Sequence, residues 1–491
     1  MANNRGICVF SGGSAANNLV DVFETVRSSK NCPLSYIIPI SDNGGSSSEL
    51  IRVFGGPGIG DIRSRLVRLI PTQPPSIERS AISALFNHRL SSTSPSEAEA
   101  EWQTIVAGTS VLWHSIPSAK KELIRSFFNL INLEILKRSR PPVSTFDFTS
   151  ASIGNLFLTG ARLFSGSFES AIYLLSSLCG IADDTIKVIP AINSNFSHHI
   201  AASLANGEVI VGQNSISHPS VSTALESPVA HINYAAKNRY SIGDSEIGFE
   251  DANMPGTLPT LRKRNIQFSK QQEEDLPARI ERLSYINPYG QFMSPPANPR
   301  VIEAIRTSQA LIYSIGSLYT SIVPSIVLRG VGHAIRTSTA RHKILILNGS
   351  IDREVGPSTN SFTAFDFVKA ITRAGEESDA FGAAGLGDQV TLNGSGVAQL
   401  RTTPYHKYVT HLIYLVGEGT PSVDRLQLSE VGIESIRLYG RKIEVVDQNG
   451  TAVTKGMRYD DNALIGAIET ILGKKGDAMT TMKSRRNTLD A

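Results

Sequence analysis

Residues 6–45 read GICVFSGGSAANNLVDVFETVRSSKNCPLSYIIPISDNGG, and this stretch decides the fold. Gly6 to Phe10 is a short apolar run typical of a buried strand, and the turn Ser11-Gly12-Gly13-Ser14 follows it directly. Apolar residues then recur at helical spacing up to Val26, and a second apolar run, LSYIIPI, covers residues 34–40. The stretch therefore predicts a strand, a glycine turn, a helix and a second strand, which form a β-α-β unit.

The same alternation of strand and helix returns in the second half of the chain. Asn298-Pro299 is a helix-start signal, and a further helix is predicted from Phe362. Apolar runs predict strands at residues 310–314, 343–347 and 408–416. Because such alternation favours a parallel sheet covered on both faces, we predict a Rossmann-like, doubly wound, mainly parallel α/β fold with long polar insertions.

The region between these halves is predicted to contain helices at 152–163 and 167–178 and strands at 185–190, 200–204 and 209–211. Asn206-Gly207, between the last two strands, is the strongest short-range hairpin signal in the chain. We interpret residues 1–473 as one domain and residues 474–491 as a mobile tail. Polar, turn-rich composition predicts insertions at about 91–101, 213–294 and 374–403.

Charge and cysteine content exclude several classes of partner and compartment. The 491 residues include 47 Lys+Arg and 44 Asp+Glu, a net charge of +3 that is too small for nucleic-acid binding. The three cysteines lie far apart with no paired spacing, which argues for a reducing compartment. Since the N-terminus also lacks the pattern of a secretory signal, a cytoplasmic location is predicted.

One uncharged run, residues 310–328, is about as long as a membrane-spanning helix. It is interrupted by Gly316 and Pro324. We therefore interpret it as a buried strand, a glycine turn and a helix near Thr320, and we expect no contact with a membrane.

The first glycine turn follows a strand and opens a helix, so its backbone N–H groups can receive a phosphate. A tight turn that needs glycine only for packing is the alternative. The turn does not match G-x-G-x-x-G, and no acidic residue closes the second strand as in ribose-binding sites. A nicotinamide or flavin site is therefore a poor fit.

Asp42, Asn43, Gly44 and Gly45 follow the second strand, at the edge where ligands bind in open α/β sheets. The two glycines would let a ligand approach the backbone closely. Asp42 is predicted to bind a metal ion on a ligand diphosphate or to orient a hydroxyl. The alternative is a carboxylate that only stabilises its own turn.

Charged residues further along the chain have similarly divided interpretations. Asp61 is expected to cap a helix that carries Arg63 and Arg65, and these arginines either clamp phosphate or are surface charges. Asp352-Arg353-Glu354 follows a strand and would meet the ligand base or sugar, or form a surface ion pair. The paired histidines His198-His199 lack the ligand spacing of a zinc site.

Several motifs resemble one known family. Residues 41–69, SDNGGSSSELIRVFGGPGIGDIRSRLVRL, are similar to the signature of the 2-phospho-L-lactate transferase (CofD)/gluconeogenesis factor family. Further matches follow in the order of that family: SIGNLFLTGARL, SAIYLL, VIPAI, ANGEVIVGQ, NPRVIEAI, GSLYTSIVPSI, LNGSIDRE and FTAFDFVKAI. The D-N-G-G-S-S form sides with the gluconeogenesis factor branch, and the resemblance covers most of the chain outside the insertions.

The resemblance implies a Rossmann-like fold that holds a nucleotide or a nucleotide-diphosphate conjugate. Transferases of this family pass a phospho-lactyl group from a guanosine diphosphate conjugate to a deazaflavin with magnesium, whereas its gluconeogenesis factors bind nucleotide sugars and regulate. By resemblance, Asp42, Asp61 and Arg63 are candidate catalytic residues, and Asp42 and Asp61 would hold Mg²⁺. The residues assigned to the phosphate, the reacting end or the pocket wall are Gly12, Gly13, Ser14, Asn43, Gly44, Gly45, Asn155, Gly316, Ser317, Tyr319, Thr320 and Ser321.

Three functional hypotheses follow: a transferase of phosphate-linked groups, a non-catalytic regulator that binds a nucleotide sugar, and a scaffold that keeps only the fold. The sequence leaves the oligomeric state open, with a homo-oligomer as one alternative. The assignment depends on one spatial expectation, that Gly13, Asp42 and Ser317 converge on a single pocket.

Overall fold

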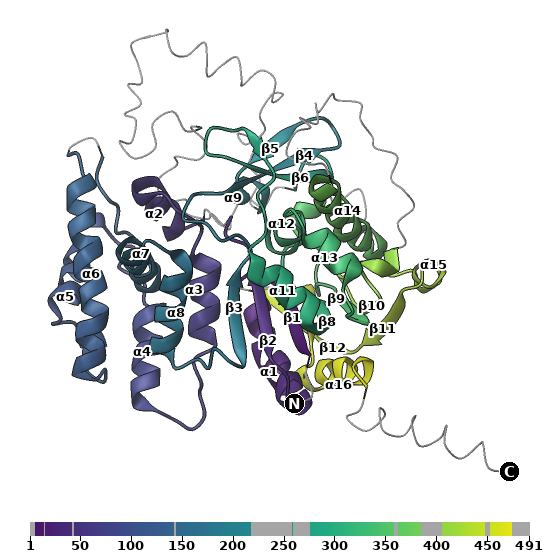
Figure 1. Ribbon diagram of the computed structural model, residues 1–491, viewed down its shortest axis with the longest axis horizontal. Helices are drawn as coiled ribbons and strands as arrows, with labels where there is room; N and C mark the ends of the chain where they lie inside the picture. The colour runs from purple at the N-terminus through teal and green to yellow at the C-terminus, as the bar shows by residue number, and fades with distance from the viewer. Residues whose placement is uncertain are drawn as a thin grey trace, which may run out of the picture.

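A seven-stranded parallel sheet forms the centre of the molecule (Figure 1). The computed structural model describes residues 5–13, 15–41, 44–141, 144–217, 258, 275–357, 362–383, 405–446 and 452–473. In spatial order the strands are β11 (Glu434–Leu438), β10 (His411–Leu415), β9 (His342–Ile346), β8 (Ser308–Tyr313), β1 (Gly6–Phe10), β2 (Leu34–Ile38) and β3 (Ile186–Pro190). Every residue of β1 and β2 is buried, as expected for apolar runs covered on both faces.

The strand order contains a switch point between β1 and β8. The chain runs outward from β1 through β2 to β3, then returns to the other side of β1 and runs outward again through β8, β9, β10 and β11. The segments that follow β1 and β8 therefore leave the sheet in opposite directions. Ligands of doubly wound sheets bind in the crevice that this reversal opens at the carboxyl ends of the strands.

Helices cover both faces of this sheet (Figure 1). One face carries α11 (Pro299–Thr307), α13 (Val331–Thr337) and α14 (Ala364–Ala383), and the other carries α1 (Val20–Lys30) and α16 (Asp461–Ile471). The described part of the second half also contains the short helices α12 (Val323–Ile326) and α15 (Arg425–Glu430). The Asn298-Pro299 signal starts α11 as predicted, because the Asn298 side chain accepts the Arg300 N–H.

A group of helices is inserted between β2 and β3 and gathers on one side of the sheet (Figure 1). It comprises α2 (Ser46–Phe54), α3 (Gly60–Arg68), α4 (Ile77–Asn87), α5 (Pro95–Ala107), α6 (Ser118–Arg138), α7 (Ile153–Ser165) and α8 (Phe168–Cys179). Its aromatic interior is centred on Trp102, which packs on Phe128 and Phe148 and donates its indole N–H to Asn132. This interior is continuous with the core of the sheet.

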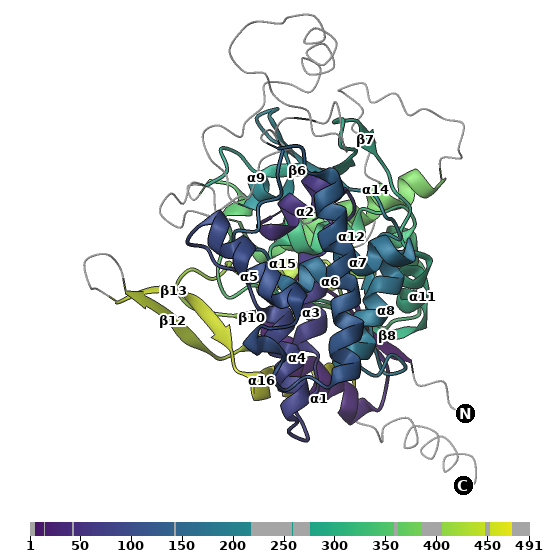
Figure 2. The same cartoon turned by 90° about the vertical axis from the view of Figure 1, so that its left-hand side faces the viewer.

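Two smaller β structures complete the fold. An antiparallel sheet has the order β5 (Val209–Val211), β4 (His199–Leu204), β6 (Ile280–Ile286) and β7 (Phe292–Met293), with α9 (Gln213–Ser217) after β5. The Asn206-Gly207 hairpin is confirmed, with Gly207 at φ +89°. A two-stranded ribbon of β12 (Gly440–Val446) and β13 (Ala452–Tyr459) projects from the body (Figure 2).

The structure corrects several boundaries. Residues 91–101 are not wholly an irregular excursion, because Ser94 caps α5 and its Ala- and Glu-rich first turns are helical. α9, β6 and β7 occupy parts of 213–294, and α14 continues through 374–383, so these segments carry more regular structure than their polar composition predicts. Asp61 does not cap α3; it is the second residue of that helix, and Ile59 precedes the first turn.

The remaining expectations concern residues 310–328, a membrane-crossing helix and the tail at 474–491. Residues 310–328 form a strand, a glycine turn and short helical segments, as expected. In the described part of the chain, no helix combines the length and apolar character that crossing a membrane requires. The predicted tail at 474–491 lies outside the described residues.

Candidate functional site

A cavity of about 430 Å³ opens at the switch point of the sheet. It is lined by Gly12 and Gly13 after β1, by residues 44–47 at the start of α2, and by Gly60, Asp61, Arg63 and Ser64 at the start of α3. The segment after β8, Asn155 of α7, Arg89 and residues of α9 complete the lining. Segments far apart in the sequence therefore converge where the fold predicts a ligand.

The turn after β1 needs its two glycines because other side chains pack against its backbone. A Cβ on Gly13 would lie 2.9 Å from Cγ of Asp61, and a Cβ on Gly12 would lie 2.8 Å from Cβ of Ser321. Both distances are shorter than real Cβ contacts. The close approach places a carboxylate from α3 and a hydroxyl from the segment after β8 against the first glycine turn.

The second glycine pair starts α2. Gly45 has φ +52°, a conformation that favours glycine, and α2 begins at the next residue. The Gly44 carbonyl accepts the Ser47 N–H at 3.1 Å, and the Gly45 carbonyl accepts the Ser48 hydroxyl at 2.6 Å. Ser46 and Ser47 thereby reach the cavity from the first turn of a helix, where N–H groups favour an anion.

A polar chain joins α3, α7 and α2 on this wall. Arg63 Nε donates to Asn155 Oδ1 at 3.2 Å, and Asn155 Nδ2 donates to Ser46 Oγ at 3.1 Å. All three side chains are buried. Gly154 is needed beside them, because a Cβ there would lie 2.6 Å from the Phe86 carbonyl oxygen. The Ile153-Gly154-Asn155 sequence therefore places one amide between the guanidinium and the serine hydroxyl.

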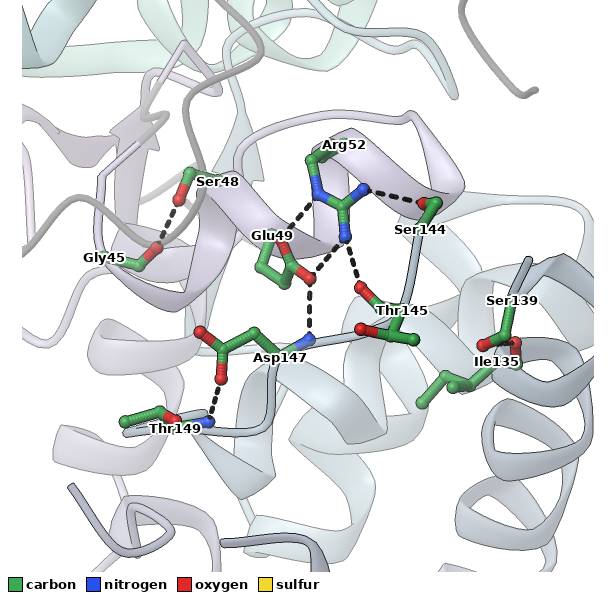
Figure 3. A network of polar contacts seen from close by, with 10 residues as sticks. All are labelled: Gly45, Ser48, Glu49, Arg52, Ile135, Ser139, Ser144, Thr145, Asp147 and Thr149. Atoms are coloured by element: carbon green, nitrogen blue, oxygen red, sulfur yellow. Dashed lines mark hydrogen bonds and ion pairs between the residues drawn. The ribbon is translucent and has the colours of Figure 1, made fainter. Parts of the chain in front are cut away.

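A buried ion pair anchors α2 from the outer side of that helix (Figure 3). Arg52 donates to both carboxylate oxygens of Glu49, at 2.7 and 2.6 Å, and to the Thr145 carbonyl at 2.8 Å. Glu49 also accepts the Asp147 N–H at 2.7 Å. Both ion-pair side chains are at most 3% exposed. The network fixes α2 on the segment 144–149, and with it the position of the serines in the cavity.

The opposite wall is the segment 315–321 after β8. Asn348 brackets Gly316: its Oδ1 accepts the Gly316 N–H and its Nδ2 donates to the Gly316 carbonyl, both at 2.9 Å. Glu354 accepts the Thr320 hydroxyl at 2.6 Å and the Tyr319 N–H at 3.1 Å. This wall is therefore held from behind by two side chains that follow β9.

Glu354 is not a surface charge. Its side chain is buried, and burial, with a smaller contribution from Asp352, raises the pKa of its carboxyl to about 8. The expectation of a surface ion pair at residues 352–354 is therefore wrong for Glu354, because the fold encloses it behind Thr320. Glu354 is therefore shielded from solvent, and it accepts a hydrogen bond from Thr320, a residue of the cavity wall.

The predicted site residues can be placed as follows. Those that line the cavity are Gly12, Gly13, Gly44, Gly45, Asp61, Arg63, Asn155, Gly316, Ser317, Thr320 and Ser321. Tyr319 does not line it, because its hydroxyl donates to the Ile280 carbonyl at 3.2 Å on the far side of the wall. Ser14, Asp42 and Asn43 lie outside the described residues, so their roles stay predictions.

Several residues of the site carried no signal in the sequence. Arg89 follows α4, and Gln213, Asn214 and Ser217 belong to α9, yet all four line the cavity. Asn348 and Glu354 support it without lining it. The LNGSIDRE resemblance pointed toward the last two, and the position of Glu354 after a strand also made it a candidate for a ligand contact. Arg65, expected either to clamp phosphate or to be a surface charge, is buried and outside the cavity lining.

Charge and chemistry define what the cavity can hold. Of the described lining residues, Asp61, Arg63 and Arg89 carry formal charge, so cations outnumber carboxylates. Arginine side chains, helix N-termini and glycine-rich turns are the groups that bind phosphate in proteins. No cluster of three or more His, Cys, Asp or Glu side chains within the described ranges could hold a metal ion by itself.

The chain is similar in sequence to several known proteins. A family model described as 2-phospho-L-lactate transferase CofD matches residues 7–434. An uncharacterized protein of Saccharomyces cerevisiae is 41% identical over 366 residues, which cover 71% of this chain and 79% of that protein. A gluconeogenesis factor of Halalkalibacterium halodurans is 22% identical over 440 residues, which cover 89% of each chain.

Solved structures show the same fold. The crystal structure of a Bacillus halodurans protein described as a member of the UPF0052 family has a TM-score of 0.53 at 18% sequence identity. The superposition covers 94% of this chain and 98% of that chain. The predicted fold class is confirmed by this similarity and by the parallel sheet described above.

Proposed function

The chain belongs to the 2-phospho-L-lactate transferase (CofD) family, and from this membership we propose that its cavity binds a nucleotide-diphosphate conjugate. The observation that carries the proposal is the convergence of two glycine turns, Arg63 and the segment 315–321 on one cavity at the switch point. Its volume of about 430 Å³ lies within the range of small-ligand sites.

The polarity of the cavity supports one orientation for the proposed ligand. The Gly12-Gly13 turn, the first turn of α2, Arg63 and Arg89 supply donors or positive charge, so the diphosphate belongs between them. Ser317 and Thr320 on the opposite wall offer neutral hydroxyl groups, which suit the uncharged parts of the conjugate. The ligand would therefore lie across the carboxyl ends of β1 and β8.

Transfer of a phosphate-linked group is the activity that we propose. An acceptor hydroxyl oxygen attacks one phosphorus of the diphosphate, the bridging P–O bond breaks, and a nucleoside phosphate leaves with the bond's electron pair. The acceptor proton passes to the leaving phosphate through solvent. Such reactions depend on positioning and on stabilisation of negative charge, which Arg63 and the turn amides are placed to provide.

Magnesium fits the donor chemistry of this site. Mg²⁺ in proteins is usually bound by one or two carboxylates together with substrate phosphates. Asp61 supplies a carboxylate against the first glycine turn, and the adjacent Ser321 supplies a hydroxyl oxygen. We propose Asp61, with Asp42 as the second predicted ligand, to hold the ion, which would neutralise the diphosphate charge.

A non-catalytic regulator is the second candidate. The relatives named gluconeogenesis factor, including one from Bacillus subtilis that is 22% identical over 375 residues, favour it. The same cavity would then bind a nucleotide sugar without turnover. The two candidates differ only in whether the bound conjugate is consumed.

Calorimetric titration with guanosine- and uridine-diphosphate conjugates, with and without Mg²⁺, tests the proposal. We expect tight binding of at least one conjugate, and Asp61→Asn should remove most of the Mg²⁺ dependence. Asp21→Asn, at an exposed position on α1, is the control and should bind as the unchanged protein does. Absence of binding by every conjugate would refute the proposal, whereas binding without product formation would select the regulator.

A further inference from the structure

Arg65 is a fully buried cation that the cavity lining does not include. It lies on α3, two residues beyond Arg63, and its guanidinium stacks 4.4 Å from the centre of the Tyr36 ring on β2. Burial lowers the pKa of Arg65, as expected for a cation removed from water. A buried charge is costly, so its partners should show what it does.

Its hydrogen-bond partners lie on the first glycine turn and at Ala16, where the next helical segment begins. Arg65 Nη2 donates to the Gly12 carbonyl at 3.0 Å and to the Ser11 hydroxyl at 3.3 Å, and Nη1 approaches the Ala16 carbonyl at 3.5 Å. Within the described residues, Arg65 contacts no carboxylate in an ion pair. The two terminal nitrogens are therefore directed at the oxygen side of the turn, whereas the buried Nε has no hydrogen-bond partner among the described residues.

The planarity of the peptide bond gives this contact a consequence for the cavity. In a trans peptide the C=O and the following N–H point in opposite directions. The Gly12 carbonyl is held toward Arg65, so the Gly13 N–H must point away from Arg65. Gly13 lines the cavity, and no acceptor for its N–H is found among the described residues.

The charge acts in the same sense as the geometry. Asp61, one turn earlier on α3, is the carboxylate that influences Arg65 electrostatically, but it lies against Gly13 instead of pairing with the guanidinium. Water is excluded around Arg65, so its field is weakly screened. The turn thus carries a cation on its carbonyl side and exposes an amide on its other side.

We propose that Arg65 is a positioning residue of the anion site: it holds the carbonyl side of the turn after β1 so that the amide side faces the ligand phosphates. This inference rests on the proposed function, because it needs an anion in the cavity. It separates the two arginines of α3, since Arg63 lines the cavity and Arg65 acts through the backbone.

Titration with inorganic pyrophosphate and with guanosine diphosphate tests the inference in the full-length protein. We expect Arg65→Gln to weaken both ligands by roughly ten- to a hundredfold, because charge-assisted hydrogen bonds to the turn are lost. Arg65→Lys keeps the charge but lacks the planar fork of two terminal nitrogens that reaches the Gly12 and Ala16 carbonyls, so a loss of roughly threefold to tenfold is expected. If Arg65 acted only through packing, Arg65→Lys would not bind the two probes more tightly than Arg65→Gln does.

Arg68→Gln is the matched control, because Arg68 lies on the same helix and its partner is the exposed Asp21. It should bind both probes as the unchanged protein does. All affinities are measured at temperatures below the unfolding transition of each variant. That transition is determined by circular dichroism. If Arg65→Gln does not fold, Arg65→Lys decides the matter.

Two results would overturn the inference. A folded Arg65→Gln variant, or Arg65→Lys when the glutamine variant does not fold, that binds pyrophosphate as tightly as the unchanged protein would refute it while leaving the proposed function intact. If the unchanged protein bound neither these probes nor any diphosphate conjugate, the proposed function and this inference would both fail.

Discussion

Gly13 contributes both to the packing of the fold and to the candidate site, because it lies against Asp61 and lines the cavity. A Cβ at this position would lie 2.9 Å from Cγ and 3.0 Å from Cα of Asp61, so either the turn or α3 has to move. We predict that Gly13→Ala lowers the free energy of unfolding by about 1 to 3 kcal/mol and weakens diphosphate binding. Urea unfolding and calorimetry measure the two effects.

Gly466 provides the control for this substitution. It lies inside α16, and a Cβ there would meet nothing within 4 Å. Gly466→Ala should therefore stabilise the protein by roughly 0.5 to 1 kcal/mol without changing ligand affinity. Equal effects of the two substitutions would show that the contact between Gly13 and Asp61 has no special importance.

Glu354 gives the stability of the protein a specific dependence on pH. Burial raises the pKa of its carboxyl from 4.5 to about 8 in the folded state, so the folded state holds this proton more tightly than the unfolded state. The stabilising contribution is complete below the unfolded pKa and is lost as the pH rises through about 8. Glu354→Gln cannot titrate, so it should remove this part of the slope.

Urea unfolding between pH 5 and 9, approximate limits that bracket the shifted pKa, measures this difference. The matched control is Glu122→Gln, since Glu122 is an exposed residue that pairs with Arg125 on α6. We expect the control to keep the slope of the unchanged protein. Parallel curves for Glu354→Gln and the unchanged protein would contradict the assignment.

At the scale of elements, α2 carries the serines of the site and is fixed by the Glu49–Arg52 pair (Figure 3). Removing one partner leaves a buried charge without compensation, which typically costs about 3 to 5 kcal/mol. We therefore predict that Arg52→Met destabilises the protein by that order and also weakens ligand binding, because Ser46 and Ser47 lose their fixed position. Chemical unfolding and calorimetric titration measure both.

The Glu24–Arg27 pair on α1 has the same spacing but is partly exposed. Arg27→Met should cost less than about 1 kcal/mol and leave the affinity unchanged. A ligand affinity that is unaffected by Arg52→Met in a folded protein would show that the network stabilises the fold without positioning the site.

The elements also show what sequence reasoning reaches. Strands β1, β2, β8, β9 and β10 and the hairpin after β4 are continuous apolar runs or strong turn signals, so local patterns suffice to predict them. The start of α5 was missed because Ser, Pro and Glu read as loop composition, although Ser94 and Pro95 begin a helix. The polar segments that contain α9 and β6 gave no usable periodicity.

The site was predictable where backbone chemistry dictates the residue type. Glycine turns and the serines and acids near them can be read directly, and Gly12, Gly13, Gly44 and Gly45 do line one cavity. Asn348, Glu354 and Arg65 could not be assigned in this way, because their roles depend on contacts with residues far away in the chain. A polar or charged side chain holds the backbone of the site only when it is buried beside that backbone. Sequence spacing does not show which side chains are buried.

At the scale of the whole molecule, the strand order decides where the site is. The segments after β1 and β8 are separated by more than half of the chain, yet adjacent parallel strands bring Gly13 and Ser317 to one crevice. That part of the spatial expectation is confirmed, and the position of Asp42 stays a prediction because it lies outside the described residues. Gln213, Asn214 and Ser217 of α9, the helix that follows β5 of the small sheet, also line the cavity.

A crystal structure of the protein grown with the tightest-binding guanosine- or uridine-diphosphate conjugate and Mg²⁺ tests the central claim most directly. The account predicts the diphosphate between the Gly12-Gly13 turn, the first turn of α2 and Arg63, with the rest of the conjugate toward Ser317 and Thr320. A conjugate bound on another surface while this cavity holds only solvent would contradict it.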